Sequence, residues 1–467
     1  MARSPEQWLE VLTQRLDARR PYIDLMRRYT EGNAPLPEMG KNLRASWEAF
    51  QRKSTANWGG FAVDARSDRI VYSGVTVGGA VDTDEAKAAA RIVRDNRLEV
   101  AFSEAITNCL ATGYGYMIVG TGDAGQAVVT SEAPEFVIVA QDPIQSWRAR
   151  AGLKVWRDSD DGKDHASVWV DGVKHPYSRP SMMNGITVMR ASAGGWKPDG
   201  DPESFTGSIP VFELENERGR SSLESLSWYT GGLSIIDHHA YLIDRINHGV
   251  LLRMVTMAMQ AFRQRALRMK SDSGGLPETD AAGNVIDYAA VFAPAPGAMW
   301  EFPEEVEGVW ESQPTDITGL LAAVKDDLRS FGALTGAMMP GVASDSENQS
   351  AEGARSGKEG MAAKASKFLR RARPVLNGAM VAALRVEGFE AADTVEVRFE
   401  PTDRVTLAEK MDAASKAKAA GMAIKTVQRD ILGWSPDQIA EDERNRQREQ
   451  AATDLGMLAG AITRQTA

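Results

Sequence analysis

The chain has 467 residues, of which 43% are hydrophobic and 25% are charged. This composition excludes wholesale disorder, and the length predicts two to four packed regions rather than one simple core. A formal charge of −10 argues against a protein that holds DNA tightly by neutralising its phosphates. Cys109 is the only cysteine, which excludes an intrachain disulfide and a thiolate metal cluster.

The N-terminal sequence leads directly into an amphipathic pattern, which is not the pattern of a secretory signal. No run approaches the roughly 20 apolar residues that a membrane span requires. We therefore expect a soluble protein that is made in a cytoplasm and has no membrane partner.

The first third of the chain predicts helices and short strands. Residues 4–7, Ser-Pro-Glu-Gln, match an N-cap, a first-turn proline and a capping-box partner. Pro21 is expected to bend or break the helix that begins there. Short β-prone pieces punctuated by glycine predict strands within 59–77, and helical spacing returns at 82–110.

The middle of the chain is β-rich and then helical. Strands are predicted at 116–119, 127–130, 136–139, 154–157, 168–170 and 186–189. The helical pattern is uninterrupted from 223 to 267, and about 30 residues of it would form a rod of roughly 45 Å. The turn-rich stretch 271–314 predicts a small β-containing excursion, after which a helix is expected at 316–334.

The C-terminal third is mostly helical. Residues 335–350 are small and flexible in composition, and a long helix is predicted at 351–386 with a kink at Pro374. A strand at 394–399 and a helix at 406–421 follow. Two shorter helices complete a charged tail.

Three stretches resemble nucleotide or cation sites, and each departs from its motif. Residues 120–125 match G-x-G-x-x-G, but a strand pattern follows where a phosphate-binding helix is needed, so we expect a hairpin turn. Residues 353–359 resemble a P-loop that is one residue short, lacks its Ser or Thr and lies in a helical pattern. Residues 158–164 resemble a calcium loop, but Arg157 takes the first ligand position.

The histidines do not have the spacing of a metal site. His238 and His239 are adjacent and should diverge on a helix, and His248 lies too far along to complete a ligand set. No nucleophile elbow or convincing carboxylate pair is found. We therefore predict no catalytic residue, no cofactor and no metal, and a protein that is not an enzyme.

Taken in order, several phrases resemble the portal protein family of tailed bacteriophages, of the siphophage type, over nearly the whole chain. The phrases are Tyr29-Thr-Glu-Gly32, Phe61-Ala-Val-Asp64, Arg69-Ile-Val-Tyr-Ser-Gly74, Gly113-Tyr-Gly-Tyr116, Ile209-Pro-Val-Phe212 and Gly219-Arg-Ser221. The resemblance implies an α+β, portal-like fold. Its parts would be a wing region at 1–222, a helical region with the first stem helix at 223–267, a clip at 268–313, a second stem helix at 314–334, a tunnel loop at 335–350, a long wing helix and strand at 351–400, and a helical crown at 401–467.

The resemblance also implies a function. Copies of the chain would form a ring, a homo-dodecamer in this family, at the special vertex of the capsid, through which double-stranded DNA is packaged and ejected. Its partners would be the terminase large subunit, scaffold and major capsid protein, and the head-tail adaptor. The virion would be its location after synthesis in the host bacterial cytoplasm. The alternatives are another virion structural protein or a DNA-processing enzyme of the packaging apparatus.

Within the tunnel loop, the residues expected to face DNA are Thr335, Gly336, Met338, Met339, Pro340, Gly341 and Ser344. A loop rich in Gly, Ala, Ser and Met can yield to DNA. For Met338, Met339 and Pro340 an ordinary helix connector is an equally good interpretation.

Overall fold

The structure is a computed structural model that divides into two compact units. Unit 1 comprises Met1–Pro35, Asn57–Ile243 and Phe331–Ala467, and unit 2 comprises Leu36–Ala56 and Asp244–Ser330. The residues that it describes are 3–37, 44–78, 83–181, 189–205, 209–261, 265–269, 278–279, 282–287, 306–311, 315–337, 351–390, 395–403, 407–434 and 436–465. Within these ranges, no helix has both the length and the apolar character needed to cross a bilayer.

Helix α1 (Pro5–Thr30) begins at the predicted capping box. Ser4 Oγ accepts from the backbone N–H of Gln7 at 3.3 Å, and Gln7 Oε1 accepts from the backbone N–H of Ser4 at 3.0 Å. Pro21 lies inside the helix, so the helix does not break there, and the bend given as the alternative stays a prediction. The lost backbone hydrogen bond is offset by burial of one apolar face. The fully buried members of this face are Leu12, Leu16, Tyr22, Ile23 and Met26.

The stretch expected to hold only short strands contains a helix. Helix α3 (Trp58–Ser67) occupies its first half and strand β1 (Tyr72–Val77) its second. Asn57 caps α3, with Oδ1 accepting from the backbone N–H of Gly60 at 2.9 Å. Gly59 lies so close to α1 that a Cβ there would meet the carbonyl oxygen of Tyr29 at 2.3 Å. Gly59, which the sequence pattern suggests as a turn residue, therefore permits close packing of α3 on α1.

The helical pattern predicted for 82–110 is two helices, α4 (Asp84–Asp95) and α5 (Leu98–Thr112). The chain breaks between them because Arg97 takes a left-handed conformation with φ 49°. Helix α5 ends at Gly113, whose φ of 91° favours glycine.

A three-stranded antiparallel sheet forms the centre of unit 1, in the order β10-β2-β3. Its strands are β2 (Tyr114–Thr121), β3 (Ala127–Glu132) and β10 (Val211–Glu215). Helix α5 packs closely on it, and a Cβ at Gly115 of β2 would lie 2.0 Å from the carbonyl oxygen of Ala105. The long helix α9 (Ala351–Val386) contacts all three strands. The resulting core includes Phe102, Ile106, Met117, Leu376 and Met380.

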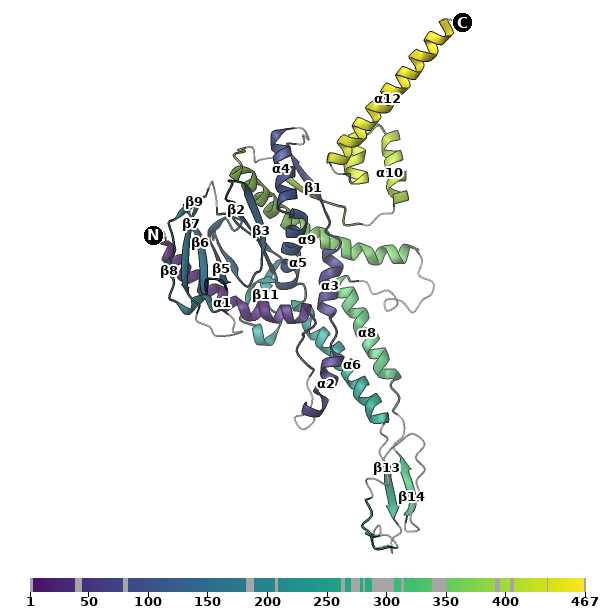
Figure 1. Cartoon of the computed structure of the whole chain (residues 1–467). Coiled ribbons are helices and arrows are strands. Elements are labelled where there is room, and N and C mark those ends of the chain that lie inside the picture. The colour runs from purple at the N-terminus through teal and green to yellow at the C-terminus, as the bar shows by residue number, and fades with distance from the viewer. Residues whose placement is uncertain are drawn as a thin grey trace. The chain divides into compact units, whose positions relative to one another are not determined.

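A second, six-stranded sheet is covered by α1 (Figure 1). Its strands are β4 (Val137–Gln141), β5 (Ala149–Asp158), β6 (Lys163–Val170), β7 (Val173–Pro180), β8 (Lys197–Pro198) and β9 (Glu203–Ser204). Alternate residues of β5 and β6 are buried together with Trp8, Leu9, Leu12 and Leu16 of α1. The short turn η1 (Ala191–Ala193) also contacts α1. The strands predicted between 116 and 170 are confirmed, and 186–188 lie outside the described residues.

The helix predicted from 223 to 267 is shorter. Helix α6 spans Ala240–Ala261. Before it lie the 3₁₀ turns η2 (Glu224–Leu226) and η3 (Asp237–His239), and the hairpin of β11 (Glu217–Arg220) with β12 (Thr230–Leu233). Gly231 and Gly232 allow β12 to approach Tyr114, and a Cβ on Gly231 would lie 2.5 Å from the Tyr114 hydroxyl. This long-range contact explains why residues 230–233 form a strand although their local sequence pattern is helical.

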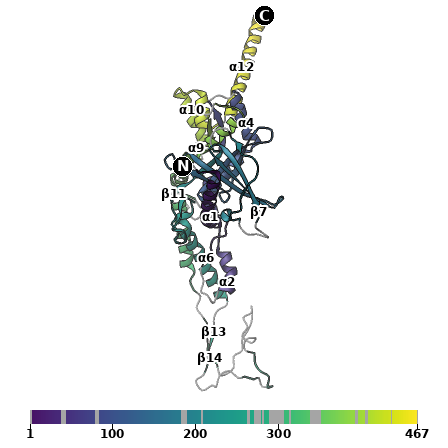
Figure 2. The same ribbon diagram turned by 90° about the vertical axis from the view of Figure 1, so that its left-hand side faces the viewer.

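Unit 2 contains α2 (Arg44–Ser54), most of α6, the hairpin of β13 (Arg265–Met269) with β14 (Val306–Glu311), and most of α8 (Thr318–Thr335). Strands β13 and β14 lie side by side in Figure 1, and Figure 2 shows the same hairpin turned by 90°. An isolated bridge joins Thr279 to Val285. The predicted β-containing excursion is therefore confirmed where the chain is described.

The C-terminal part of unit 1 follows the predicted order. Helix α9 has the predicted bounds and runs through Pro374, and the kink expected there stays a prediction. Strand β15 (Val395–Phe399) pairs with β1. The remaining elements are α10 (Leu407–Ala419), α11 (Ile424–Val427), the π-helical turn η4 (Gln428–Leu432) and α12 (Pro436–Gln465). The fold is α+β, as predicted.

Candidate functional site

The first residues of the predicted tunnel loop, Thr335 and Gly336, form the C-terminal cap of α8. Thr335 Oγ1 donates to the carbonyl oxygen of Phe331 at 2.6 Å and accepts from the backbone N–H of Ala337 at 3.2 Å. Gly336 has φ 80° and donates its N–H to the carbonyl oxygen of Gly332 at 2.9 Å. The composition of the loop's first two residues thus suits the end of a helix.

Two basic side chains hold this helix end. Arg66 Nη2 of α3 donates to the carbonyl oxygen of Thr335 at 3.3 Å, and Lys364 Nζ of α9 donates to that of Leu334. The last carbonyl groups of a helix attract cations because they carry unsatisfied partial negative charge. The start of the predicted tunnel loop is therefore fixed by α3 and α9.

The other five predicted loop residues, Met338, Met339, Pro340, Gly341 and Ser344, lie outside the described residues. Helix α9 begins at Ala351, as expected. The DNA-facing role of these residues stays a prediction.

The two predicted stem helices run antiparallel within unit 2. Three residue pairs join α6 to α8 or the segment before it: Arg245 with Asp327, Gly249 with Val324, and Gln260 with Thr315. As the residue number on α6 rises from 245 to 260, the number of its partner falls from 327 to 315. The two segments therefore run in opposite directions. The guanidinium of Arg245 contacts the Asp327 carboxylate at 2.6 and 3.0 Å. A Cβ on Gly249 would lie 2.8 Å from Val324 Cγ2, so glycine permits the close approach.

The antiparallel pair β13 and β14 overlaps the predicted clip: β14 lies inside 268–313, whereas β13 begins at Arg265, in the last residues of the region predicted to be helical. Arg265 pairs with Glu311 at one end, and Met269 pairs with Val306 at the other. Arg268 Nε contacts Glu307 Oε2 at 3.1 Å. In chain order, the hairpin lies between the two predicted stem helices, which is the order that the resemblance implies.

A buried polar network connects α1 to the three-stranded and the six-stranded sheet of unit 1. Arg19 Nη1 of α1 donates to the hydroxyl of Tyr116 on β2 at 2.7 Å, and this hydroxyl donates to Glu213 Oε2 on β10 at 2.5 Å. Gln141 Nε2 of β4 donates to Glu213 Oε1 at 2.6 Å. Arg19 Nη2 also donates to the carbonyl oxygens of Pro134 and Val137. Tyr116 is fully buried, and its hydroxyl bridges the two charges.

The network shifts the ionisation of Glu213. Burial raises the pKa of its carboxyl to about 7, although the hydrogen bond from Tyr116 and the charge of Arg19 oppose the shift. Such a perturbed group can mark a catalytic site. Here its partners come from α1, β2 and β4, so the network joins these elements to β10 within unit 1.

The two nucleotide-like motifs are structural elements. Residues 120–125 form the turn of the β2–β3 hairpin, in which the N–H of Gly122 donates to the carbonyl oxygen of Gln126 at 2.8 Å. Residues 353–359 lie inside α9 and therefore do not form a loop. Both outcomes confirm the sequence-based interpretation.

The calcium-like stretch is the tip of the β5–β6 hairpin. Asp158, Asp161 and His165 each bring one ligand-type atom to within 4.8 Å of the others. Their contacts are those of a hairpin turn: Asp158 Oδ1 accepts from the N–H of Asp160, and Asp161 Oδ1 from that of Lys163, each at 2.8 Å. His165 Nε2 lies 2.8 Å from Asp161 Oδ2. These hydrogen bonds explain why the three side chains lie close together at the exposed tip.

The adjacent histidines differ from expectation. His238 and His239 belong to the 3₁₀ turn η3, and both line one cavity of about 210 Å³ in unit 1. The same cavity is lined by Arg66, Lys364, Lys367 and Arg371. Sequence reasoning missed this basic cluster. The available signal was the run Lys364–Arg373 on α9, which holds five basic residues and no acidic one.

The comparisons with known proteins cover nearly the whole chain. Residues 9–453 match the family described as "Phage portal protein, SPP1 Gp6-like". No curated protein matches the chain. A chain of the solved structure "Virion of native gene transfer agent (GTA) particle" is 15% identical with a TM-score of 0.48, over 89% of this chain and 99% of that one. A chain of "Neck of native GTA particle computed with C12 symmetry" is 14% identical with a TM-score of 0.46, over the same shares.

The family match spans every predicted part of the chain, from α1 through the stem helices and the clip strands to α12. The chain therefore belongs to the family of phage portal proteins.

Proposed function

We propose that the chain forms the ring at one capsid vertex through which double-stranded DNA is packaged and ejected. The observation that carries this proposal is the portal-family match across residues 9–453. The antiparallel pair α6 and α8, with a β-hairpin between them in sequence, is consistent with it. Repeated around an axis, such helix pairs can line a channel.

The ring is proposed to contain twelve copies, the number implied by the family. A head-to-tail interface closes into a ring when its rotation divides a full turn, and it needs no two-fold patch. Two apolar side chains in the turn between β4 and β5 support association, since Ile144 is 88% and Trp147 is 83% exposed in the single chain.

The segment 335–350 is proposed to be the tunnel loop that meets DNA. A formal charge of −10 for the whole chain supports loose passage of DNA, because tight phosphate neutralisation would raise friction. The hairpin of β13 and β14 is proposed to dock the terminase large subunit and then the head-tail adaptor. Scaffold and major capsid protein would contact the ring in the virion. No catalytic step is proposed for the chain.

The test exchanges residues 338–344 for a rigid connector and measures DNA packaging into capsids. We expect packaging to fall while ring formation, followed by electron microscopy, is retained. A matched exchange of residues 122–125, the β2–β3 turn, should leave packaging unchanged. Full packaging with a rigid connector at 338–344 would contradict the tunnel-loop role.

A further inference from the structure

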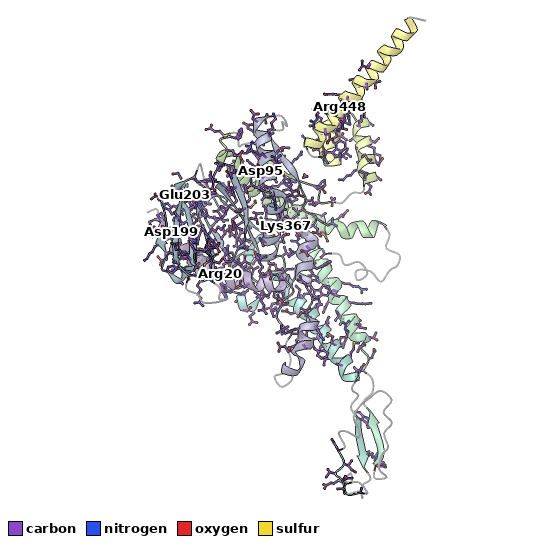
Figure 3. The ribbon with its side chains drawn as sticks, viewed as in Figure 1. Arg20, Asp95, Asp199, Glu203, Lys367 and Arg448 are labelled. Carbon is purple, nitrogen blue, oxygen red and sulfur yellow. The ribbon has the colours of Figure 1, made fainter. Side chains whose placement is uncertain are left out.

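One cavity of unit 1 concentrates positive charge in a chain whose formal charge is −10. Its basic side chains come from two elements, Arg66 from α3 and Lys364, Lys367 and Arg371 from α9. The three α9 residues follow spacings of three and four, which puts them on one face of the helix. Figure 3 labels Lys367 on α9. The cluster is therefore built by tertiary packing as well as by sequence.

The charges of this cluster are only partly balanced. Glu217 is the carboxylate that lines the cavity in the described part of the chain, and Lys367 Nζ pairs with it. The other three cations donate to uncharged carbonyl oxygens: Arg66 to Thr335, Lys364 to Leu334, and Arg371 to Asn216. A guanidinium has five N–H donors and an ammonium three, so donors remain on each group.

Burial and mutual repulsion act on these groups. Burial lowers the pKa of Lys364, and the nearby Arg66 lowers it further. Burial also lowers the pKa of His239, with a contribution from Lys364. An anion in the cavity would relieve this repulsion. A volume of about 210 Å³ is below the roughly 300–1,000 Å³ of pockets for larger ligands, which favours a small anion.

We propose that the cavity lined by Arg66, Lys364, Lys367 and Arg371 binds a phosphate group. Guanidinium and ammonium groups are the side chains that recognise phosphate, through charge-assisted hydrogen bonds. The phosphate can come from free inorganic phosphate or from a nucleic-acid backbone. The proposal goes beyond the channel function and does not depend on ring formation.

The first test is calorimetric titration of the full chain with inorganic phosphate at constant ionic strength. The variants Lys364→Gln and Arg371→Gln should each weaken binding at least about 10-fold, because each removes a charge-assisted hydrogen bond. Arg385→Gln is the matched control, an exposed arginine on the same helix outside the cavity, and should bind like the unchanged chain.

A variant that is expected to bind phosphate more tightly keeps the test informative even if another variant fails to fold. Glu217→Gln removes the carboxylate that competes with phosphate for Lys367, so it should tighten phosphate binding, an outcome that unfolding cannot produce. The proposal is overturned if the unchanged chain shows no saturable heat with phosphate, or if Glu217→Gln and Arg371→Gln give the same isotherm as the unchanged chain.

A second arm identifies the source of the phosphate. Duplex DNA of random sequence is titrated into the same proteins at several salt concentrations. If the backbone is the source, Arg371→Gln should weaken DNA binding and reduce its salt dependence, and inorganic phosphate should compete. If free phosphate is the source, DNA binding should be equal in the Arg371→Gln and Arg385→Gln variants while phosphate binding differs.

Discussion

Replacing Tyr116 with phenylalanine tests the buried polar network of unit 1. The hydroxyl of Tyr116 accepts from Arg19 at 2.7 Å and donates to Glu213 at 2.5 Å, and the side chain is fully buried. The phenyl ring keeps nearly all of the packing, so the substitution isolates the two hydrogen bonds.

The expected loss of folding stability follows from the hydrogen bonds that Arg19 and Glu213 would lose with the Tyr116 hydroxyl. A hydrogen bond to a charged group contributes roughly 1.5–3 kcal/mol. Arg19 keeps its bonds to two carbonyl oxygens, and Glu213 keeps the bond from Gln141. We therefore expect Tyr116→Phe to lower the free energy of unfolding by about 3 kcal/mol, near the lower end for two such bonds.

The assay is urea unfolding of the full chain, followed by circular dichroism. Tyr177→Phe is the matched control, because the Tyr177 hydroxyl makes one long hydrogen bond of 3.3 Å, to Glu6. It should cost less than about 1 kcal/mol. Equal losses in the two variants would refute the role assigned to the Tyr116 bridge.

Three further predictions concern stability. Because the pKa of Glu213 is raised to about 7, stability that is present below about pH 4.5 is lost as pH rises through 7. Glu213→Gln should abolish this decline, which amounts to at most roughly 3 kcal/mol because the side chain keeps some exposure, and denaturant midpoints from pH 5 to 8 measure it. Gly115→Ala should lower the thermal midpoint strongly, since its Cβ would lie 2.0 Å from the Ala105 carbonyl oxygen, whereas soluble protein with an unchanged midpoint would show that α5 can move. Arg245→Ala should cost less than about 1 kcal/mol in urea unfolding, because the Arg245 side chain that pairs with Asp327 is 63% exposed, and a larger loss would indicate that the pair does more than a surface ion pair.

The sequence predicted correctly those helices and strands that are determined by residues close together in the chain. The capping box at Ser4 fixed the start of α1, and helical spacing fixed the bounds of α9 at 351–386. The β-prone runs between 116 and 170 are strands; β3 has the alternating burial of a half-buried strand, whereas β2 and β6 are buried over consecutive residues. The order of phrases was sufficient to suggest the portal family, which the match to residues 9–453 confirms.

The departures have long-range causes. The helix expected from 223 begins at Ala240, because β12 pairs with β11 and packs against Tyr114. Residues 58–67 are helical because Gly59 packs on α1. The basic cavity combines Arg66 with residues nearly 300 positions away on α9, a proximity that no local pattern contains. Of the predicted tunnel loop, Thr335 and Gly336 are now placed, as the cap of α8.

The most direct test of the portal function is negative-stain electron microscopy of the purified chain, with mass photometry of the same sample. The account predicts rings with a central hole and a mass near that of twelve subunits, formed by the chain alone or with scaffold and capsid protein. A compact monomer or dimer that stays free of rings when scaffold and capsid protein are present would contradict it.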